Sequence, residues 1–315
     1  MAEIGKDILF ARQLLENGDL VAIPTETVYG LAGNALSATS VAKIFSTKNR
    51  PQFDPLIVHV PSLEKAKDYV SEIPDLAKAL TEKFWPGPLT LLLKKKNIIP
   101  DLVTSGLDTV GIRCPDHSLT RDLLALLDFP LAAPSANPFG YVSPTEPSHV
   151  NEQLGEKIKY ILDGGVCPVG IESTIVGFEN GKPVVYRLGG LSVEDIESVV
   201  GKVQVQTHST SNPKAPGQLK SHYAPTKKVV LGKIDQLIDA HSSKRIGILS
   251  FQKDFGLPNQ IILSPAGSVE EAAQHLFSAL RAFDKLPVDV VLAELIPEQG
   301  LGRAINDRLR RAASE

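Results

Sequence analysis

The sequence predicts a mixed α/β protein with two domains of unequal size. Short apolar runs typical of buried strands alternate with segments whose apolar residues recur at helical spacing. Several strand candidates follow one another with only loops between them, which favours a mixed sheet over a strictly parallel one. A stretch rich in Ser, Thr, Pro and Lys at 201–226 interrupts this pattern, and a regular βαβ pattern returns after it. A large mixed domain followed by a small α/β domain is therefore expected.

The first domain is expected to open with a helix. Apolar side chains at Ile8, Ala11, Leu14 and Leu15 share one helical face, and the Asn-Gly pair at 17–18 is a typical helix end. The same spacing predicts helices near 39–47, 62–70, 75–84 and 193–200. Apolar runs predict strands at 20–23, 56–60, 89–94, 110–113, 131–133, 158–162, 174–176 and 184–187.

The second domain repeats short strands and helices in alternation. Apolar runs predict strands at 229–231, 246–249, 261–263 and 288–292, and shorter helices are expected at 234–241 and 301–313. Between the last two strands, apolar residues from Val269 to Phe283 fall on one face of a long helix. The predicted boundaries are 1–203 for the first domain, 204–226 for a linker and 227–315 for the second domain.

Composition excludes several classes of protein. The 33 Lys and Arg residues against 36 Asp and Glu give a net charge of −3, which argues against nucleic-acid binding by bulk charge and leaves a local basic cleft open. The two cysteines, Cys114 and Cys167, form no CxxC pair, so a disulfide scaffold and a Cys₄ zinc site are excluded. The first residues lack a signal pattern and no apolar run reaches 18 residues, so we expect a cytoplasmic protein without membrane contact.

Common catalytic motifs are absent from the sequence. It contains no GxxxxGK[ST], GxGxxG, HExxH or GxSxG, and its seven histidines show no metal-ligand spacing. These absences argue against a dehydrogenase with a dinucleotide fold and against a zinc hydrolase.

Two polar segments of the first half follow regular elements, and each has a structural alternative. The segment PTETVYGL at 24–31 follows a strand, where open α/β sheets bind ligands, but Thr and Glu also suit the start of a helix. Lys48 and Arg50 follow a helix. They suit a phosphate clamp, and they are equally the cations that a helix C-terminus favours.

Two further segments place polar groups at the ends of strands. Arg113 ends an apolar strand and needs an anionic partner, which is either a substrate carboxylate or a structural ion pair. Ser135 and Asn137 follow the strand at 131–133 and can donate to an anion or a base, or serve as ordinary turn residues. The segment 172–174, Glu-Ser-Thr, has the same two interpretations.

Taken in order, these segments resemble the Sua5/YrdC/YciO family in its two-domain Sua5 form. The resemblance spans almost the whole chain. The family's Lys-x-Arg and Ser-x-Asn signatures are intact as Lys48/Arg50 and Ser135/Asn137. The segments that carry the resemblance are PTETVYGL, KNRP, DPLIVHV, WPGPLTLLL, TVGIRCP, APSAN, GIESTIV, SHYAP and the C-terminal GLGRAINDRLRRAA.

The resemblance implies a fold and an activity. The fold is a YrdC-like twisted mixed open sheet flanked by helices, followed by a smaller Rossmann-like α/β C-terminal domain. The activity is that of a nucleotidyltransferase, which makes threonylcarbamoyl-AMP and pyrophosphate from L-threonine, bicarbonate or CO₂, and ATP, with Mg²⁺ accompanying the nucleotide. The product serves N6-threonylcarbamoylation of adenosine 37 in tRNA, through a downstream threonylcarbamoyl transferase complex.

The resemblance also assigns residues to the two substrates. It implies that Lys48 and Arg50 face the triphosphate and carry the catalysis. The linker is expected to fold over the site as a lid, and His59 to serve either as a hydrogen-bonding group or as a base. Asp54 is an unexpected acid beside the triphosphate unless it assists metal binding or points away. The remaining nucleotide residues are Ser135, Asn137, Ser143, Arg187 and Tyr223, and the threonine residues are Thr25, His59, Thr109, Arg113 and Ser173.

Two other classes of function remain open from the sequence. One is an RNA-binding module, in which a basic cleft contacts tRNA and binding depends steeply on salt. The other is a small-molecule sensor without turnover, whose output is the C-terminal domain. Pyrophosphate release that requires both threonine and bicarbonate distinguishes the enzyme from both alternatives.

Overall fold

The computed structural model of the chain describes residues 1–207, 215–216 and 223–314. Within them, one large sheet forms the frame of the first domain. Its strands are β1 (Glu3–Gly5), β2 (Val21–Ile23), β3 (Gly30–Asn34), β4 (Ile57–His59), β5 (Leu89–Lys94), β6 (Thr109–Arg113), β7 (Leu131–Ala132), β8 (Tyr160–Leu162), β9 (Thr174–Glu179), β10 (Lys182–Arg187) and β11 (Gln204–Val205). Their order is β1-β8-β2-β3-β7-β4-β6-β5-β9-β10-β11. Neighbouring strands pair in both directions, since β6 is parallel to β4 and antiparallel to β5, so the predicted mixed sheet is confirmed.

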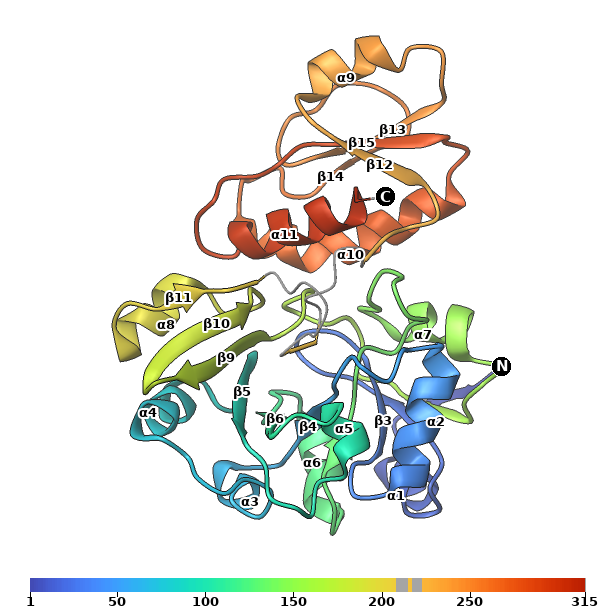
Figure 1. Cartoon of the computed structure of the whole chain (residues 1–315). Coiled ribbons are helices and arrows are strands. Elements are labelled where there is room, and N and C mark those ends of the chain that lie inside the picture. Colours follow the sequence, from blue (N-terminus) through green and yellow to red (C-terminus); the bar gives the residue numbers. More distant parts are fainter. Residues whose placement is uncertain (208–214, 217–222, 315) are drawn as a thin grey trace.

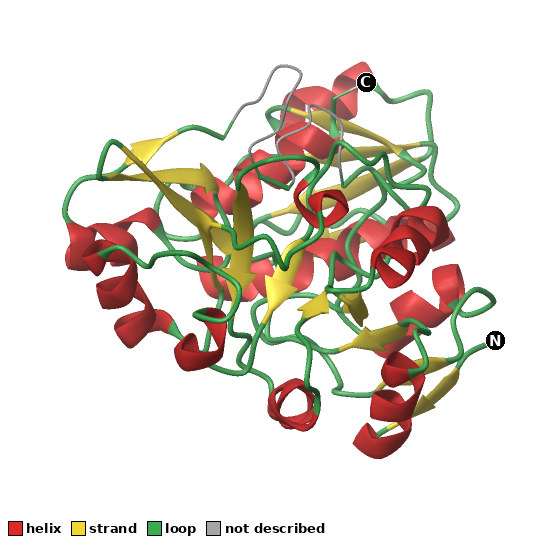
Figure 2. Cartoon of the chain, turned by 60° about the horizontal axis from the view of Figure 1, so that its bottom comes forward, coloured by secondary structure: helices red, strands yellow, loops and turns green. Residues whose placement is uncertain are grey.

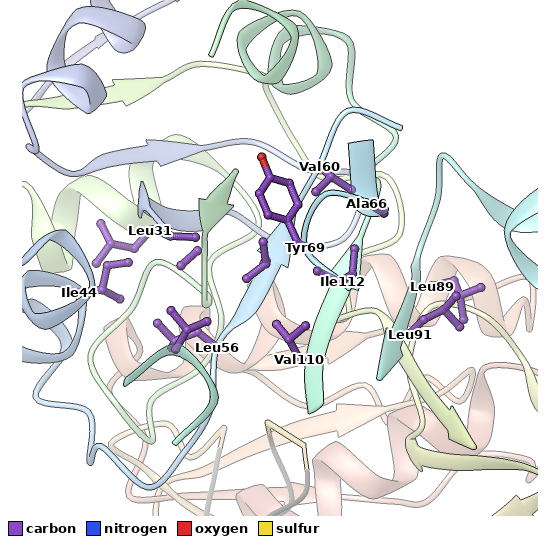
Figure 3. Packing of buried hydrophobic residues seen from close by; sticks show 14 of the residues in the cluster. Leu31, Ile44, Leu56, Val60, Ala66, Tyr69, Leu89, Leu91, Val110 and Ile112 are labelled. Atoms are coloured by element: carbon purple, nitrogen blue, oxygen red, sulfur yellow. The ribbon is translucent and has the colours of Figure 1, made fainter. Parts of the chain in front are cut away.

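Helices surround this sheet and bury its apolar side chains. Figure 2 shows the strands in the interior of the first domain with helices around the outside. In the core, Leu31 of β3 lies beside Ile44 and Leu56, and each is almost completely buried (Figure 3). Burying one such side chain stabilises the fold by about 1.5–3 kcal/mol. The helices are α1 (Ile8–Glu16), α2 (Ala38–Lys48), α3 (Leu63–Ala66), α4 (Asp75–Phe84), α5 (Asp101–Thr104), α6 (Ser118–Leu126), α7 (Pro147–Leu154) and α8 (Val193–Val200).

Some of these elements are absent from the sequence prediction, namely β1, β3, β11, α5, α6 and α7. The strand β3 reads GLAGN, a composition with little strand propensity, and it forms because β2 and β7 pair with it on both edges. The strand β11 pairs in parallel with β10, with Gln204 opposite Val184. The expected linker is therefore corrected at its start, because its first two residues belong to the sheet.

The second domain is a four-stranded sheet in which all strands are parallel. Its elements are β12 (Lys228–Leu231), α9 (Ile234–Ala240), β13 (Ile246–Ser250), β14 (Gln260–Ile262), α10 (Val269–Lys285), β15 (Val290–Ala293) and α11 (Gly302–Ala312), in the strand order β12-β15-β13-β14. Figure 1 shows α10 and α11 on the face of this sheet that is turned toward the first domain, with α9 on the other face. This arrangement agrees with the expected Rossmann-like domain.

The two domains share an apolar core. Val28, Val142 and Ile171 of the first domain belong to the same buried cluster as Phe277 of α10 and Leu309 of α11. Polar contacts reinforce the apolar packing. Arg281 of α10, for example, donates to the carbonyl oxygen of Ser143 at 3.3 Å and to the side chain of Gln153 at 2.9 Å. The second domain is thus packed against the part of the first domain from which the site described below is built.

Candidate active site

A cavity lies where β4 and β6 end, and it encloses about 570 Å³ when the part open to solvent is included. The two strands are parallel and finish with His59 directly beside Arg113. Sheets of this kind bind ligands outside the carboxyl ends of their strands. The lining residues are Thr25, Val28, Gly30, Arg50, Pro55, Ile57, His59, Arg113, Ala133, Pro134, Ser135, Glu172, Ser173, Arg187, Pro216 and Tyr223.

Two buried guanidinium groups in the lining come from the ends of strands. Arg113, at the end of β6, donates to the hydroxyl oxygen of Thr27 at 2.8 Å and forms an ion pair with Glu26 at 2.7 Å. Arg187, at the end of β10, donates to the carbonyl oxygen and to the hydroxyl of Ser173, both at 3.0 Å. Burial lowers the pKa of Arg187. Both side chains are thus fixed in position before any ligand binds.

The third guanidinium group in the lining belongs to Arg50, which follows α2. It donates to the carbonyl oxygens of Asp54 and Pro55 and forms an ion pair with the Asp54 carboxylate at 2.8 Å. Asp54 is completely buried, and this burial raises the pKa of its carboxyl group. Asp54 therefore points at Arg50. This acid lies beside the expected phosphate site because it pairs with the arginine there.

Lys48, at the end of α2, is also completely buried but does not line the cavity. Its ammonium group donates to the carbonyl oxygens of Ser135 and Asn137. Burial, and then the neighbouring Arg50 charge, lower the pKa of Lys48. In this structure the lysine holds the loop after β7 in place, and a direct contact to a phosphate requires it to leave those carbonyls.

The opposite wall combines a carboxylate with hydroxyl groups. Glu172 accepts a hydrogen bond from the Ser143 hydroxyl at 2.5 Å, and the hydroxyls of Ser173 and Thr90 are hydrogen bonded at 2.8 Å. Tyr223 lines the cavity from the described end of the linker, and burial raises the pKa of its hydroxyl to about 12. In the part of the chain that the structure describes, three guanidinium groups and one carboxylate line the cavity, and Asp54 and Glu26 pair with two of the guanidinium groups from behind the lining. Fixed guanidinium groups of this kind suit an anionic ligand.

His59 sits in this cationic surrounding as a neutral imidazole. Burial, reinforced by the nearby Arg113 charge, lowers the pKa of His59 to about 3. Its Nδ1 has no hydrogen-bond partner within the described residues. A general base works best when its pKa lies near the operating pH, so the hydrogen-bonding role is favoured over proton transfer.

The structure brings most of the predicted site residues together. Asn137 and Ser143 lie behind the lining together with Lys48, since the Asn137 amide donates to the carbonyl oxygens of Pro138 and Tyr141. Thr109 lies at the opposite end of β6, in a separate groove with Leu92 and Phe178, so the structure does not bring it together with the residues that line the cavity. The predicted residues that line the cavity are Thr25, Arg50, His59, Ser135, Arg113, Ser173, Arg187 and Tyr223.

The lid can be followed only in part. Pro216 and Tyr223 of the expected lid line the cavity, while 208–214 and 217–222 lie outside the described residues. Besides Asp54, two carboxylates of the site pair with arginines distant in the sequence, Glu26 with Arg113 and Glu172 with Arg308 of α11, and sequence reasoning missed both pairs. Glu26 stands inside the polar segment 24–31 and Glu172 inside the segment 172–174, but neither has a spacing that connects it to its distant arginine.

Among the residues that the structure describes, no three His, Cys, Asp or Glu side chains gather as metal ligands. In the same residues, no helix has the length and apolar composition needed to cross a membrane.

Comparisons with known proteins point to one family. A Sua5/YciO/YrdC family model, described as "Telomere recombination", matches residues 13–189, and a second, described as "Threonylcarbamoyl-AMP synthase, C-terminal domain", matches residues 191–314. The threonylcarbamoyl-AMP synthase of Pyrococcus abyssi is 41% identical, and the alignment covers 97% of this chain and 94% of that protein. The Bacillus subtilis threonylcarbamoyl-AMP synthase is 39% identical over 96% of this chain and 92% of its own length.

Solved structures agree with the sequence relatives. The crystal structure of P. abyssi Sua5 complexed with L-threonine matches with a TM-score of 0.94 at 40% identity, covering 99% of this chain and 97% of that chain. The structure of Escherichia coli YciO has a TM-score of 0.54 at 21% identity and covers 60% of this chain and 96% of its own, which is a likeness of fold.

Proposed function

Because the chain belongs to the Sua5 family of threonylcarbamoyl-AMP synthases, we propose that the cavity described above is where L-threonine, bicarbonate or CO₂, and ATP are joined. The reaction makes threonylcarbamoyl-AMP, so the protein is a nucleotidyltransferase that serves tRNA modification. The observation that carries the assignment of the site is the set of three fixed, buried guanidinium groups around a neutral imidazole.

The chemistry needs positioning and charge, and no covalent enzyme nucleophile. The threonine amine adds to the carbon of CO₂ and loses a proton, which gives a carbamate. A carbamate oxygen then attacks the α-phosphorus of ATP, and the bond to pyrophosphate breaks. Holding the reactants together contributes roughly 7–11 kcal/mol. Cations fixed in advance stabilise the charge that develops on the phosphates.

We assign the threonine end of the cavity to the side where β4 and β6 finish. A fork of guanidinium N–H groups matches a carboxylate, so Arg113 holds the threonine carboxylate. The Nδ1 of His59, which has no hydrogen-bond partner among the described residues, is available to the amino group of threonine. The side chains of Thr25 and Ser173, whose hydroxyls are hydrogen bonded within the protein, line the pocket around it. The neighbour's complex with L-threonine supports a threonine site in this fold.

We assign the nucleotide end to the opposite side of the cavity. Arg50 and Arg187 face the phosphates, and Ser135 and Tyr223 contact the nucleotide. Lys48, Asn137 and Ser143 lie behind the lining and act through the groups that they hydrogen bond. Lys48 and Asn137 hold the loop after β7, and Ser143 holds Glu172.

Mg²⁺ fits this arrangement as a companion of ATP. The described residues offer no cage of three ligands, and Asp54 is engaged by Arg50, so phosphate oxygens and water would supply most of the coordination. When bound, the metal would neutralise phosphate charge. The downstream threonylcarbamoyl transferase complex would then take the product, and the reaction requires no direct contact with tRNA.

Pyrophosphate release tests the proposal directly. The expected result is release from ATP only when threonine and bicarbonate are both present, whereas an RNA-binding or sensing module would release none. In the same assay, Arg113→Lys keeps the charge but loses the fork, so the KM for threonine should rise much more than the KM for ATP. A reversed ranking would move Arg113 away from the threonine carboxylate.

A further inference from the structure

The C-terminal domain contributes a buried cation to the wall of the cavity. Arg308, on α11, is completely buried, and it reaches Glu172 across 136 positions of sequence. We propose that Arg308 is a positioning residue of the active site, which acts through Glu172 and Tyr223 and keeps the nucleotide end attractive to phosphate. The proposal rests on the assignment of ATP to this cavity.

The contact with Glu172 fixes a carboxylate in the lining. The Nε and one terminal nitrogen of Arg308 both donate to Glu172 Oε2, at 3.2 and 3.1 Å. The other oxygen, Oε1, accepts from the hydroxyl of Ser143. Both oxygens of a carboxylate that faces the cavity are therefore held, one of them by the second domain.

The contact with Tyr223 fixes an aromatic ring in the same wall. The guanidinium carbon of Arg308 lies 5.1 Å from the centre of the Tyr223 ring, which is a cation–π contact. The ring also stacks on Phe277 of α10, with 5.5 Å between centres. Tyr223 has a φ of +65°, which an L-residue with a large side chain adopts only where its surroundings hold it. The second domain supplies those surroundings.

Arg308 is itself held in place by its own helix. Its remaining terminal nitrogen donates to Asp307 at 3.1 Å, and Asp307 accepts from Arg311 one helical turn away at 3.0 Å. A guanidinium group with partners on both sides is oriented before substrate arrives, which is the property that a positioning residue needs.

The charge of Glu172 explains why a cation is needed here. An unneutralised carboxylate in the wall repels the triphosphate, and the repulsion is strong because Glu172 is almost completely buried. Arg308 balances that charge from behind, so Glu172 does not offset the nearby guanidinium group of Arg187. Threonine carries no net charge, and its binding should be far less sensitive to this cancellation.

Steady-state kinetics of three variants test the proposal. Arg308→Met removes the cation, and we expect the KM for ATP to rise at least about tenfold while the KM for threonine stays within about twofold. Glu172→Gln added to Arg308→Met removes the exposed carboxylate and should recover most of the ATP affinity. Arg310→Met is the matched control, because Arg310 lies on the same helix in an exposed ion pair with Glu298, and it should change neither constant.

The other possible outcomes would also distinguish a positioning role of Arg308 from a purely structural one. If Arg308 only stabilises the fold, Arg308→Met lowers the amount of active enzyme and leaves both KM values unchanged, and adding Glu172→Gln restores only the amount of enzyme. The double variant, which buries no unpaired charge, keeps the test valid if Arg308→Met fails to fold. A wild-type protein that releases no pyrophosphate overturns the proposed function, whereas normal wild-type turnover with an unaltered Arg308→Met overturns only this inference.

Discussion

His59 is a residue whose proton affinity the site lowers strongly. In the unfolded chain its imidazole takes a proton below about pH 6.5, whereas in the folded protein its pKa is lowered to about 3 by burial and by Arg113. Between these two values the unfolded state binds more protons than the native state. The free energy of unfolding therefore falls as the pH is lowered through this window.

This difference makes His59 one source of the acid sensitivity of the fold. Replacing His59 with Gln should flatten the decline in the free energy of unfolding between pH 6.5 and pH 4, measured by denaturant titration at several pH values. The remaining slope includes His149, whose pKa is also lowered, to about 4, first by burial. An unchanged slope in His59→Gln would contradict the shifted pKa.

At the scale of residues, the sequence predicts those site residues that lie in recognisable segments. Arg50, Arg113 and Arg187 are cations at the ends of predicted elements, and the structure brings all three to one cavity. Arg308 could not be found in this way. It lies on a helix with three other arginines, and no spacing distinguishes the arginine that turns inward to meet Glu172.

At the scale of elements, α10 and the loop before β9 approach so closely that a glycine is required. Gly170 has a φ of +79°, and a Cβ added there would lie 2.6 Å from the carbonyl oxygen of Ala273 on α10. Gly181, in the turn between β9 and β10, has a similar φ of +75° with no atom within 4 Å of an added Cβ. Comparing substitutions at these two positions therefore separates the cost of a left-handed backbone from the cost of crowding between the domains.

Alanine substitutions at the two glycines test this close approach. Both variants place a side chain on a left-handed backbone, but only Gly170→Ala pushes α10 away. Gly170→Ala should therefore be less stable than Gly181→Ala by about 1–3 kcal/mol. Denaturant unfolding measures both. Equal losses would mean that α10 can move away from the loop without cost.

The elements themselves were predictable where their sequence pattern is strong. The long amphipathic helix of the second domain appears where its apolar face indicates, as α10. β3 was not predictable, because two glycines in five residues favour a strand only when neighbouring strands enclose them. β11 has two residues, which is too short for a sequence pattern to predict a strand.

At the scale of the whole molecule, the shared core makes the two domains one unfolding unit. Phe277 is completely buried in a cluster that contains residues of both domains. Phe277→Ala should lower the temperature of one calorimetric transition for the whole chain, with a loss of about 3–5 kcal/mol. Leu257→Ala, at a position 37% exposed in the same domain, is the control and should change it little. Two transitions of which only one moves would show that the domains unfold independently.

The division into two domains was readable from the change in composition after residue 200. The sequence does not show that the second domain helps to build the wall of the cavity. The contacts that build it join residues more than a hundred positions apart, such as Arg308 and Glu172. Long-range contacts of this kind depend on how the domains pack, and a single sequence contains no periodicity that reports it.

The ion pair between Arg308 and Glu172 also limits how such a gene can evolve. A point mutation that removes Arg308 leaves Glu172 buried without its cation, and breaking a buried pair in this way costs about 3–5 kcal/mol. Replacing Glu172 with an uncharged residue such as Gln costs less, because Arg308 keeps its ion pair with Asp307. The easier order of change therefore begins at Glu172. A second domain exchanged between relatives functions only where it brings a matching partner for that position.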